Sequence, residues 1–102
     1  SEMAFTGEAI DAQTALEWGM VSAVVDPDHL LDAAHELASR VSANPPQVLR
    51  MTKRLLREGQ HQSLESILEL SAAMQAVAHH TEDHHEAVGA LLERRTPQFT
   101  GR

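Results

Sequence analysis

The sequence has no cysteine and very few aromatic residues, and each absence excludes something. Without cysteine the chain forms neither disulfides nor thiolate ligands, which is consistent with a reducing compartment, so we expect a cytoplasmic protein. Aromatic residues make up 3% of the 102 residues and hydrophobic residues 42%. Aliphatic side chains must therefore supply most of any core. A composition rich in alanine and leucine favours packed helices.

Positive charge is also scarce. Lys and Arg total 8 and Asp and Glu total 15, which gives a formal net charge of -7. This balance argues against binding to nucleic acid or to an anionic membrane. The chain also lacks an apolar run of about 18 residues and the basic, apolar start of a secretion signal. We therefore expect neither nucleic acid nor a membrane as partner.

Apolar residues recur at helical spacing along most of the chain. Asp11, Ser63 and Thr81 are good N-caps, and Pro46 can open a first helical turn because its missing N–H is not needed there. Gly19 stands where a left-handed residue would end a helix. The pattern predicts about five helices, at residues 11–18, 28–44, 46–58, 63–80 and 82–95.

One segment departs from this pattern. Residues 20–25 are rich in valine and lie between Gly19 and Asp26-Pro27. This composition and these borders are typical of a short strand. The sequence offers it no partner strand. The predicted fold class is therefore mainly α, with one short strand near residues 20–25.

Three stretches carry a family resemblance. Residues 5–12 with 15–25 resemble the pattern TGE.I.A..A...G.V..VV. Residues 43–46, followed by a helix with Lys53, resemble A..P..A...K, and residues 82–102 resemble ED..EG...F.EKR.P.F.G. Their order and spacing, over nearly the whole chain, resemble the C-terminal part of the enoyl-CoA hydratase/isomerase proteins of the crotonase superfamily.

The resemblance implies a fold and a division of labour. Residues 1–26 would end the crotonase core region, and residues 27–102 would form the C-terminal helical domain, which supports oligomerisation and one wall of a CoA site. The family stabilises an enolate oxyanion with two backbone N–H groups that precede the Thr6-Gly7-Glu8 passage. No catalytic residue is therefore assigned to this chain. We expect it to be inactive alone, and its start at Ser1-Glu2-Met3 suggests a cut.

The resemblance also implies partners and one ligand contact. Family members pack their C-terminal helices at a trimer interface, so we expect a homo-oligomer. The substrate of the intact family protein is an acyl-CoA, and no other cofactor is expected. Arg94 matches the family's basic residue that approaches the adenosine phosphate portion of CoA, beside Arg95. Compensation of the helix dipole explains Arg94 as well as the CoA contact does, and it explains Arg95 better. Gln75 and Leu91 stand where relatives often have aromatic residues, so adenine stacking is not expected.

Several acidic residues and histidines allow other hypotheses. Glu65 with Glu69, and the cluster Glu82, Asp83 and Glu86, resemble acid/base pairs, but solvated helix faces and dipole partners explain them better. Histidines four residues apart on one helix can bind zinc. Thr81 interrupts the helix here, so we assign no metal site. The histidines in question are His79, His80, His84 and His85.

The few aromatic residues and the overall helical character lead to two further expectations. The aromatic residues Phe5, Trp18 and Phe99 are expected in the core, since isolated aromatic residues on apolar helix faces are usually buried. The main functional alternative is a free-standing helical homo-oligomeric interaction module without CoA chemistry. A histidine-based metal protein is a third hypothesis.

Overall fold

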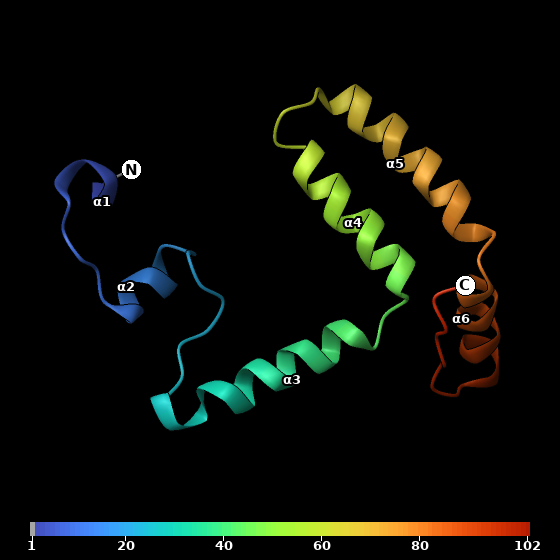
Figure 1. The fold of residues 1–102 in the computed structure, drawn as a ribbon, viewed down its shortest axis with the longest axis horizontal. Helices are drawn as coiled ribbons and strands as arrows, with labels where there is room; N and C mark the ends of the chain where they lie inside the picture. The colour runs from blue at the N-terminus through green and yellow to red at the C-terminus, as the bar shows by residue number, and fades with distance from the viewer. Residues whose placement is uncertain (1) are drawn as a thin grey trace. The chain divides into compact units, whose positions relative to one another are not determined.

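Helices and their connections make up the whole described structure, a computed structural model of residues 2–102 (Figure 1). The mainly helical prediction is confirmed, with one α-helix more than the five predicted. No helix in the described part of the chain is both long and apolar enough to cross a bilayer. The elements are α1 (Glu2–Thr6), α2 (Ala12–Glu17), the 3₁₀ turn η1 (Pro27–His29), α3 (Leu30–Ser42), α4 (Pro46–Glu58), α5 (Leu64–His79) and α6 (Glu82–Glu93).

The chain separates into two compact units, Ser1–Leu37 and Ala38–Arg102. The first unit contains α1, α2 and the beginning of α3. The second contains α4, α5 and α6 and carries the C-terminal segment. The family-based division after residue 26 stays a prediction.

The helix ends follow the capping residues predicted from sequence. Asp11 accepts the Thr14 N–H at 2.7 Å, and this backbone bond lowers the pKa of the Asp11 carboxyl. The hydroxyl of Ser63 likewise caps α5, and that of Thr81 accepts the His84 N–H at 3.1 Å to cap α6. Each bond satisfies a donor that the first helical turn leaves without a partner.

The predicted strand at residues 20–25 is wrong. That segment is irregular, and residues 2–102 contain no strand. A strand needs a neighbour to accept and donate its ladder hydrogen bonds, and no extended segment pairs with this one in the part of the chain described. Gly19, at φ 70, instead ends α2.

The second unit is built around a helical hairpin. Helices α4 and α5 lie side by side and antiparallel (Figure 1), and they share most of the contacts between helices in this unit. Half-buried side chains meet between them, including Met51, Leu55, Ile67 and Met74. Helix α6 follows after a break at Thr81, whose hydroxyl also donates to the Ala78 carbonyl at 2.7 Å. Thr81 therefore ends one helix and begins the next.

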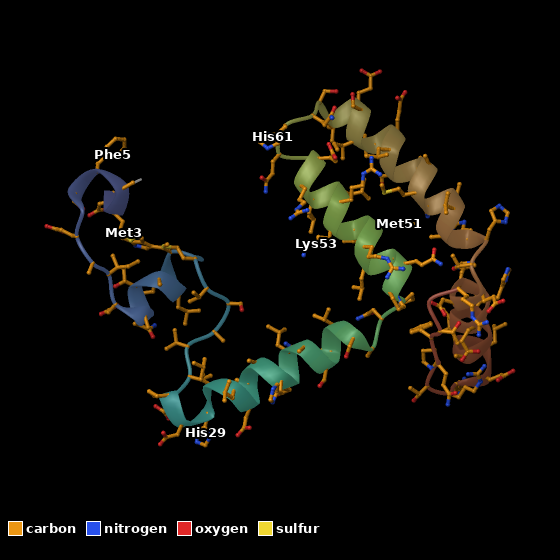
Figure 2. The ribbon with its side chains drawn as sticks, viewed as in Figure 1. Met3, Phe5, His29, Met51, Lys53 and His61 are labelled. Atoms are coloured by element: carbon orange, nitrogen blue, oxygen red, sulfur yellow. The ribbon has the colours of Figure 1, made fainter. Side chains whose placement is uncertain are left out.

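Large apolar side chains are exposed in both units. Phe5 projects from α1 (Figure 2) and is 89% exposed, and Trp18 is 47% exposed. The expectation that these two residues lie in a core is wrong, and Phe99 is half-buried. Ala90 is the one hydrophobic residue that is buried among those described. Within each unit the helices thus have apolar faces that the rest of that unit does not cover.

Candidate functional site

The segment after α6 turns back and runs along the helix (Figure 1). Asp83, in the first turn of α6, accepts the Thr100 N–H at 2.7 Å and the Gly101 N–H at 2.9 Å, one on each carboxylate oxygen. The Asp83 N–H in turn donates to the Arg102 carbonyl at 3.1 Å. Asp83 is only 2% exposed. A buried carboxylate is tolerated when hydrogen bonds replace its water, so Asp83 fastens the segment to α6.

The prediction of a solvated face is therefore wrong for Asp83. The dipole interaction at the start of α6 explains an acidic residue there, but it does not explain burial. Sequence reasoning missed the long-range contact because Asp83 and Gly101 lie 18 positions apart. The available signal was the final Thr100-Gly101, since a glycine lets the backbone approach another group closely.

Glu86 holds the beginning of the same segment. The two terminal nitrogens of Arg95 contact its two carboxylate oxygens, with Nη2 2.8 Å from Oε2, and the Gln98 N–H donates to Oε1 at 2.8 Å. The hydrogen bond from Arg95, followed by that from Gln98, lowers the pKa of Glu86 to about 2. The same contact raises the pKa of Arg95. Such a forked pair fixes the orientation of the two side chains as well as the distance between them.

A third contact joins the segment to α4. The Gln47 side-chain amide donates to the Gly101 carbonyl at 2.8 Å. Gly101 has φ 81, and a Cβ atom at that position would lie 3.5 Å from Cγ of Pro46. The C-terminal segment therefore bridges the starts of α4 and α6 within the second unit.

Arg94 lies at the turn between α6 and this segment. It has φ 55 and ψ 41, and among residues 2–102 it is the one residue other than glycine with positive φ. The Arg94 N–H donates to the Leu91 carbonyl and the Arg95 N–H to the Ala90 carbonyl. This pair of bonds is the Schellman ending of a helix, in which glycine is usual at the left-handed position. Gly19 occupies that position after α2, whereas arginine occupies it here.

The two neighbouring arginines differ in their surroundings. Besides its fork on Glu86, Arg95 places Nε 2.6 Å from Oε2 of Glu93. Arg94 is exposed, and within residues 2–102 its guanidinium forms no ion pair. Arg95 is thus paired with two carboxylates, whereas the exposed guanidinium of Arg94 forms no ion pair within residues 2–102.

The two positions considered for adenine stacking, Gln75 and Leu91, carry no aromatic ring. Gln75 is exposed on α5 and lines a hollow beside α4. Leu91 is 78% exposed and lies one helical turn before Arg94. The Leu91 side chain near Arg94 is therefore an exposed aliphatic group, which cannot stack on a base as an aromatic ring would.

Histidines gather around the break between α5 and α6. The rings of His79 and His84 lie 4.6 Å apart on the two sides of Thr81, and those of His84 and His85 lie 5.8 Å apart. No group of three or more metal-ligating side chains comes together among the described residues. His61 is separate from these histidines, because it lies in the connection between α4 and α5, before the start of α5 (Figure 2).

The acidic candidates lie either on an exposed helix face or in contact with the C-terminal segment. Glu65 and Glu69 are both exposed on α5, which agrees with the prediction of a solvated helix face. Asp83 and Glu86 are occupied by the C-terminal segment.

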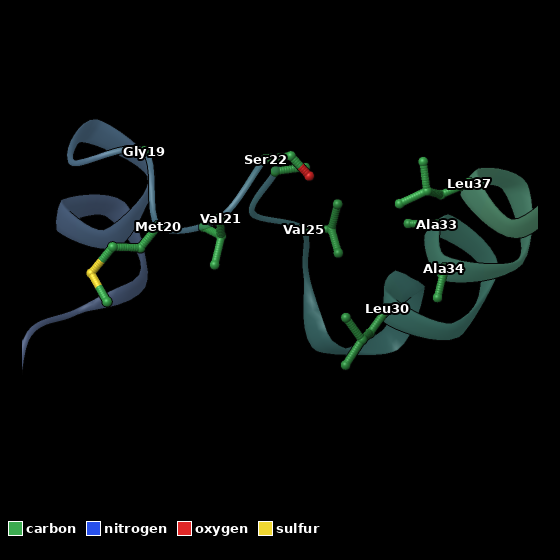
Figure 3. Close-up of a pocket in the computed structure, with 10 residues that line it drawn as sticks. Gly19, Met20, Val21, Ser22, Val25, Leu30, Ala33, Ala34 and Leu37 are labelled. Atoms are coloured by element: carbon green, nitrogen blue, oxygen red, sulfur yellow. The ribbon is translucent and has the colours of Figure 1, made fainter. Parts of the chain in front are cut away.

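The first unit contains an open apolar hollow of about 600 Å³ (Figure 3). Met20, Val21 and Val25 border it on one side, and Leu30 and Leu37 of α3 on the other. Of the ten described residues that line it, Ser22 alone has a polar side chain. Such a surface can bury apolar groups, but it has no charged group for catalysis.

Comparisons with known proteins agree with this architecture. A 2,3-dehydroadipyl-CoA hydratase from Escherichia coli is 38% identical over 102 residues, which are 100% of this chain and 40% of that protein. A 1,2-epoxyphenylacetyl-CoA isomerase from the same organism is 35% identical over 98% of this chain and 38% of its own. The crystal structure of an enoyl-CoA hydratase from Bacillus anthracis superimposes with a TM-score of 0.94 at 33% identity, covering 99% of this chain and 39% of that one.

The chain thus spans about 40% of the length of these relatives. The sequence model described as enoyl-CoA hydratase/isomerase matches residues 1–102. On this match, this chain belongs to the enoyl-CoA hydratase/isomerase family, within the crotonase superfamily.

Proposed function

We propose that this chain is the C-terminal helical part of a protein that acts on acyl-CoA thioesters. In this proposal it contributes self-association and part of a CoA site, and the catalytic groups lie in the family region that it does not match. The observation that carries the proposal is a match over the whole chain to about 40% of relatives whose names describe hydratases and isomerases of CoA esters.

The exposed apolar side chains support a role in assembly. Leu91 and Leu92 are 78% and 79% exposed, and Leu64 is 75% exposed. Burying apolar surface yields about 25 cal/mol per Å², so extensive apolar faces favour association. The proposed coverings are the remainder of the family fold and other copies of the chain.

The arrangement of the acidic residues supports the proposed lack of catalysis by the chain alone. Addition of water to an enoyl thioester and isomerisation both need a group that moves protons and donors that stabilise an oxyanion. Asp83 is closed off by two backbone bonds, and the Glu86 carboxylate is held by Arg95 and Gln98. Neither carboxylate is placed to receive a substrate proton.

Arg94 is the proposed contact to the adenosine phosphate portion of CoA. A guanidinium is suited to phosphate because its planar donors match the phosphate oxygens. Its exposure and its lack of an ion pair within residues 2–102 support this role, as does its left-handed backbone, which a glycine would adopt at lower cost. An arginine at a position that favours glycine is more readily explained by its side chain than by the turn.

Calorimetric titration of the chain with CoA and with dephospho-CoA tests this contact. Arg94→Gly should weaken CoA binding at least about tenfold, because a charge-assisted bond contributes roughly 1.5–3 kcal/mol. It should not lower the free energy of unfolding, since glycine suits the turn. Arg57→Ala, which removes an exposed arginine from α4, controls for net charge. Equal affinities of Arg94→Gly and Arg57→Ala would refute the contact.

Two further measurements separate the alternatives. Light scattering should show an oligomer, and an assay with crotonyl-CoA should show no turnover. Turnover would refute the proposed division of catalytic groups, and a strictly monomeric chain would refute the assembly role. An oligomer without any affinity for CoA would favour the free-standing interaction module instead.

A further inference from the structure

We propose that Glu86 is a positioning residue for Arg94, an inference that rests on the proposed CoA contact. Glu86 lies seven residues before the last residue of α6, on the side of the helix that the C-terminal segment covers. Its carboxylate accepts hydrogen bonds from two residues that come after Arg94 in the chain. These are the side chain of Arg95 and the backbone N–H of Gln98. In this way it restrains the chain just beyond the turn.

The restraint holds Arg94 in a backbone conformation that is unfavourable for arginine. A residue with a Cβ atom is disfavoured in the left-handed conformation and remains there only when its surroundings demand it. On the helix side, Arg94 is held by its bond to the Leu91 carbonyl at 3.3 Å. On the other side, the Glu86 contacts hold Arg95 and Gln98. Arg94 cannot leave the left-handed region without disturbing one of these sets.

Glu86 also pairs with Arg95, the cation that would compete with Arg94 for a ligand. A free Arg95 guanidinium would compete with Arg94 for the same carboxylates or the same anion. In the structure the two terminal nitrogens of Arg95 are held by Glu86, whereas Glu93 contacts only its Nε, and Arg94 forms no ion pair within residues 2–102. The side chain of Arg94 is thereby kept available for a ligand.

Simple electrostatics makes the opposite prediction, which provides the test. A carboxylate near a phosphate site repels the ligand, so its removal alone should tighten binding. Removal of a positioning carboxylate should weaken binding. Glu93 is the matched control, because it also contacts Arg95 but holds no part of the segment after Thr96 in the described structure.

The experiment is titration of CoA into the full chain and its Glu86→Ala and Glu93→Ala variants. Glu86→Ala should weaken CoA binding on the order of fivefold, a typical coupling between residues of one network. Glu93→Ala should leave affinity unchanged or raise it. Glu86→Gln, which keeps the side-chain length, should shift affinity in the same direction as Glu86→Ala. Circular dichroism at the titration conditions verifies that each variant is folded.

The Arg94→Gly background distinguishes positioning from general damage. With no guanidinium to position, adding Glu86→Ala should cause no further loss of CoA affinity, whereas a purely structural role would lower affinity in both backgrounds. If Arg94→Gly weakens binding and Glu86→Ala does not, the positioning role is refuted and the CoA contact stands. If Arg94→Gly itself has no effect, the proposed CoA contact fails.

Discussion

Glu86 shows how a single side chain at a helix surface can be specialised by its contacts. Its carboxylate has an ordinary pKa of 4.5 and a folded-state pKa of about 2, because Arg95 and Gln98 donate to the charged form. A lowered folded-state pKa means that the unfolded chain binds the proton more readily. The stabilisation from Glu86 is therefore present above pH 4.5 and is lost as the pH falls toward 2.

Acid unfolding should reveal this contribution. The free energy of unfolding should decline from about pH 4.5 toward pH 2 in the natural sequence. It should decline less in Glu86→Gln, whose amide does not titrate. The measurement is urea unfolding at a series of pH values. Identical pH profiles for the two proteins would contradict the role assigned to the Glu86 contacts.

Replacement of glycine by alanine should change the free energy of unfolding in opposite directions at positions 101 and 89. Gly101→Ala should destabilise the fold by about 1 kcal/mol, since its φ of 81 is unfavourable for alanine. Gly89→Ala should stabilise it by up to about 1 kcal/mol, because Gly89 lies inside α6 and a Cβ there would be 3.8 Å from Nη2 of Arg95, an ordinary contact. Urea unfolding measures both, and a shift of the same sign in both variants would contradict the backbone assignment.

At the scale of elements, α6 and the C-terminal segment form one unit of structure. The helix contributes Asp83, Glu86 and Ala90 along one side, at spacings that return to the same face. The segment contributes mostly backbone N–H groups, so the contact depends more on chain path than on side-chain type. This explains how a short irregular segment stays in place without a core of its own.

Asp83→Asn should separate this segment from α6. An asparagine accepts one N–H bond well but turns its NH₂ group toward the second donor, which costs roughly 1–3 kcal/mol. Hydrogen exchange should therefore lose protection at the Thr100 and Gly101 amides while the α4 and α5 amides keep theirs. Glu82→Gln is the control. Glu82 lies in the same turn but is exposed, and its Oε2 atom is 3.8 Å from Nε of Arg102, beyond hydrogen-bond distance. Equal protection in both variants would contradict the role of Asp83.

At the scale of the whole molecule, exposed apolar surface is the main feature. Leu56 and Leu68 are 70% and 59% exposed and line one hollow of about 420 Å³ between α4 and α5. We expect association to cover such surfaces. Leu68→Gln should therefore shift sedimentation velocity toward smaller species. Glu65→Gln, on the same helix and already polar, should not, and association unaffected by Leu68→Gln would remove this face from the interface.

The sequence by itself determined the helices and most of their ends. Helical periodicity, and caps such as Asp11, Ser63 and Thr81, depend on residues within a few positions of each other, so local chemistry is sufficient. The family resemblance was also confirmed. It too depends on short local motifs and on their order, which the sequence shows directly. The sequence also singled out Arg94, though not the difference between Arg94 and Arg95.

Only the tertiary structure decided which residues come together over long distances. The burial of Asp83, the fork between Glu86 and Arg95 and the contact of Gln47 with Gly101 join residues 9 to 54 positions apart. The missing strand at residues 20–25 and the exposure of Phe5 have the same origin. A strand needs a pairing partner and an apolar side chain needs a covering surface, and both depend on how the chain packs in three dimensions.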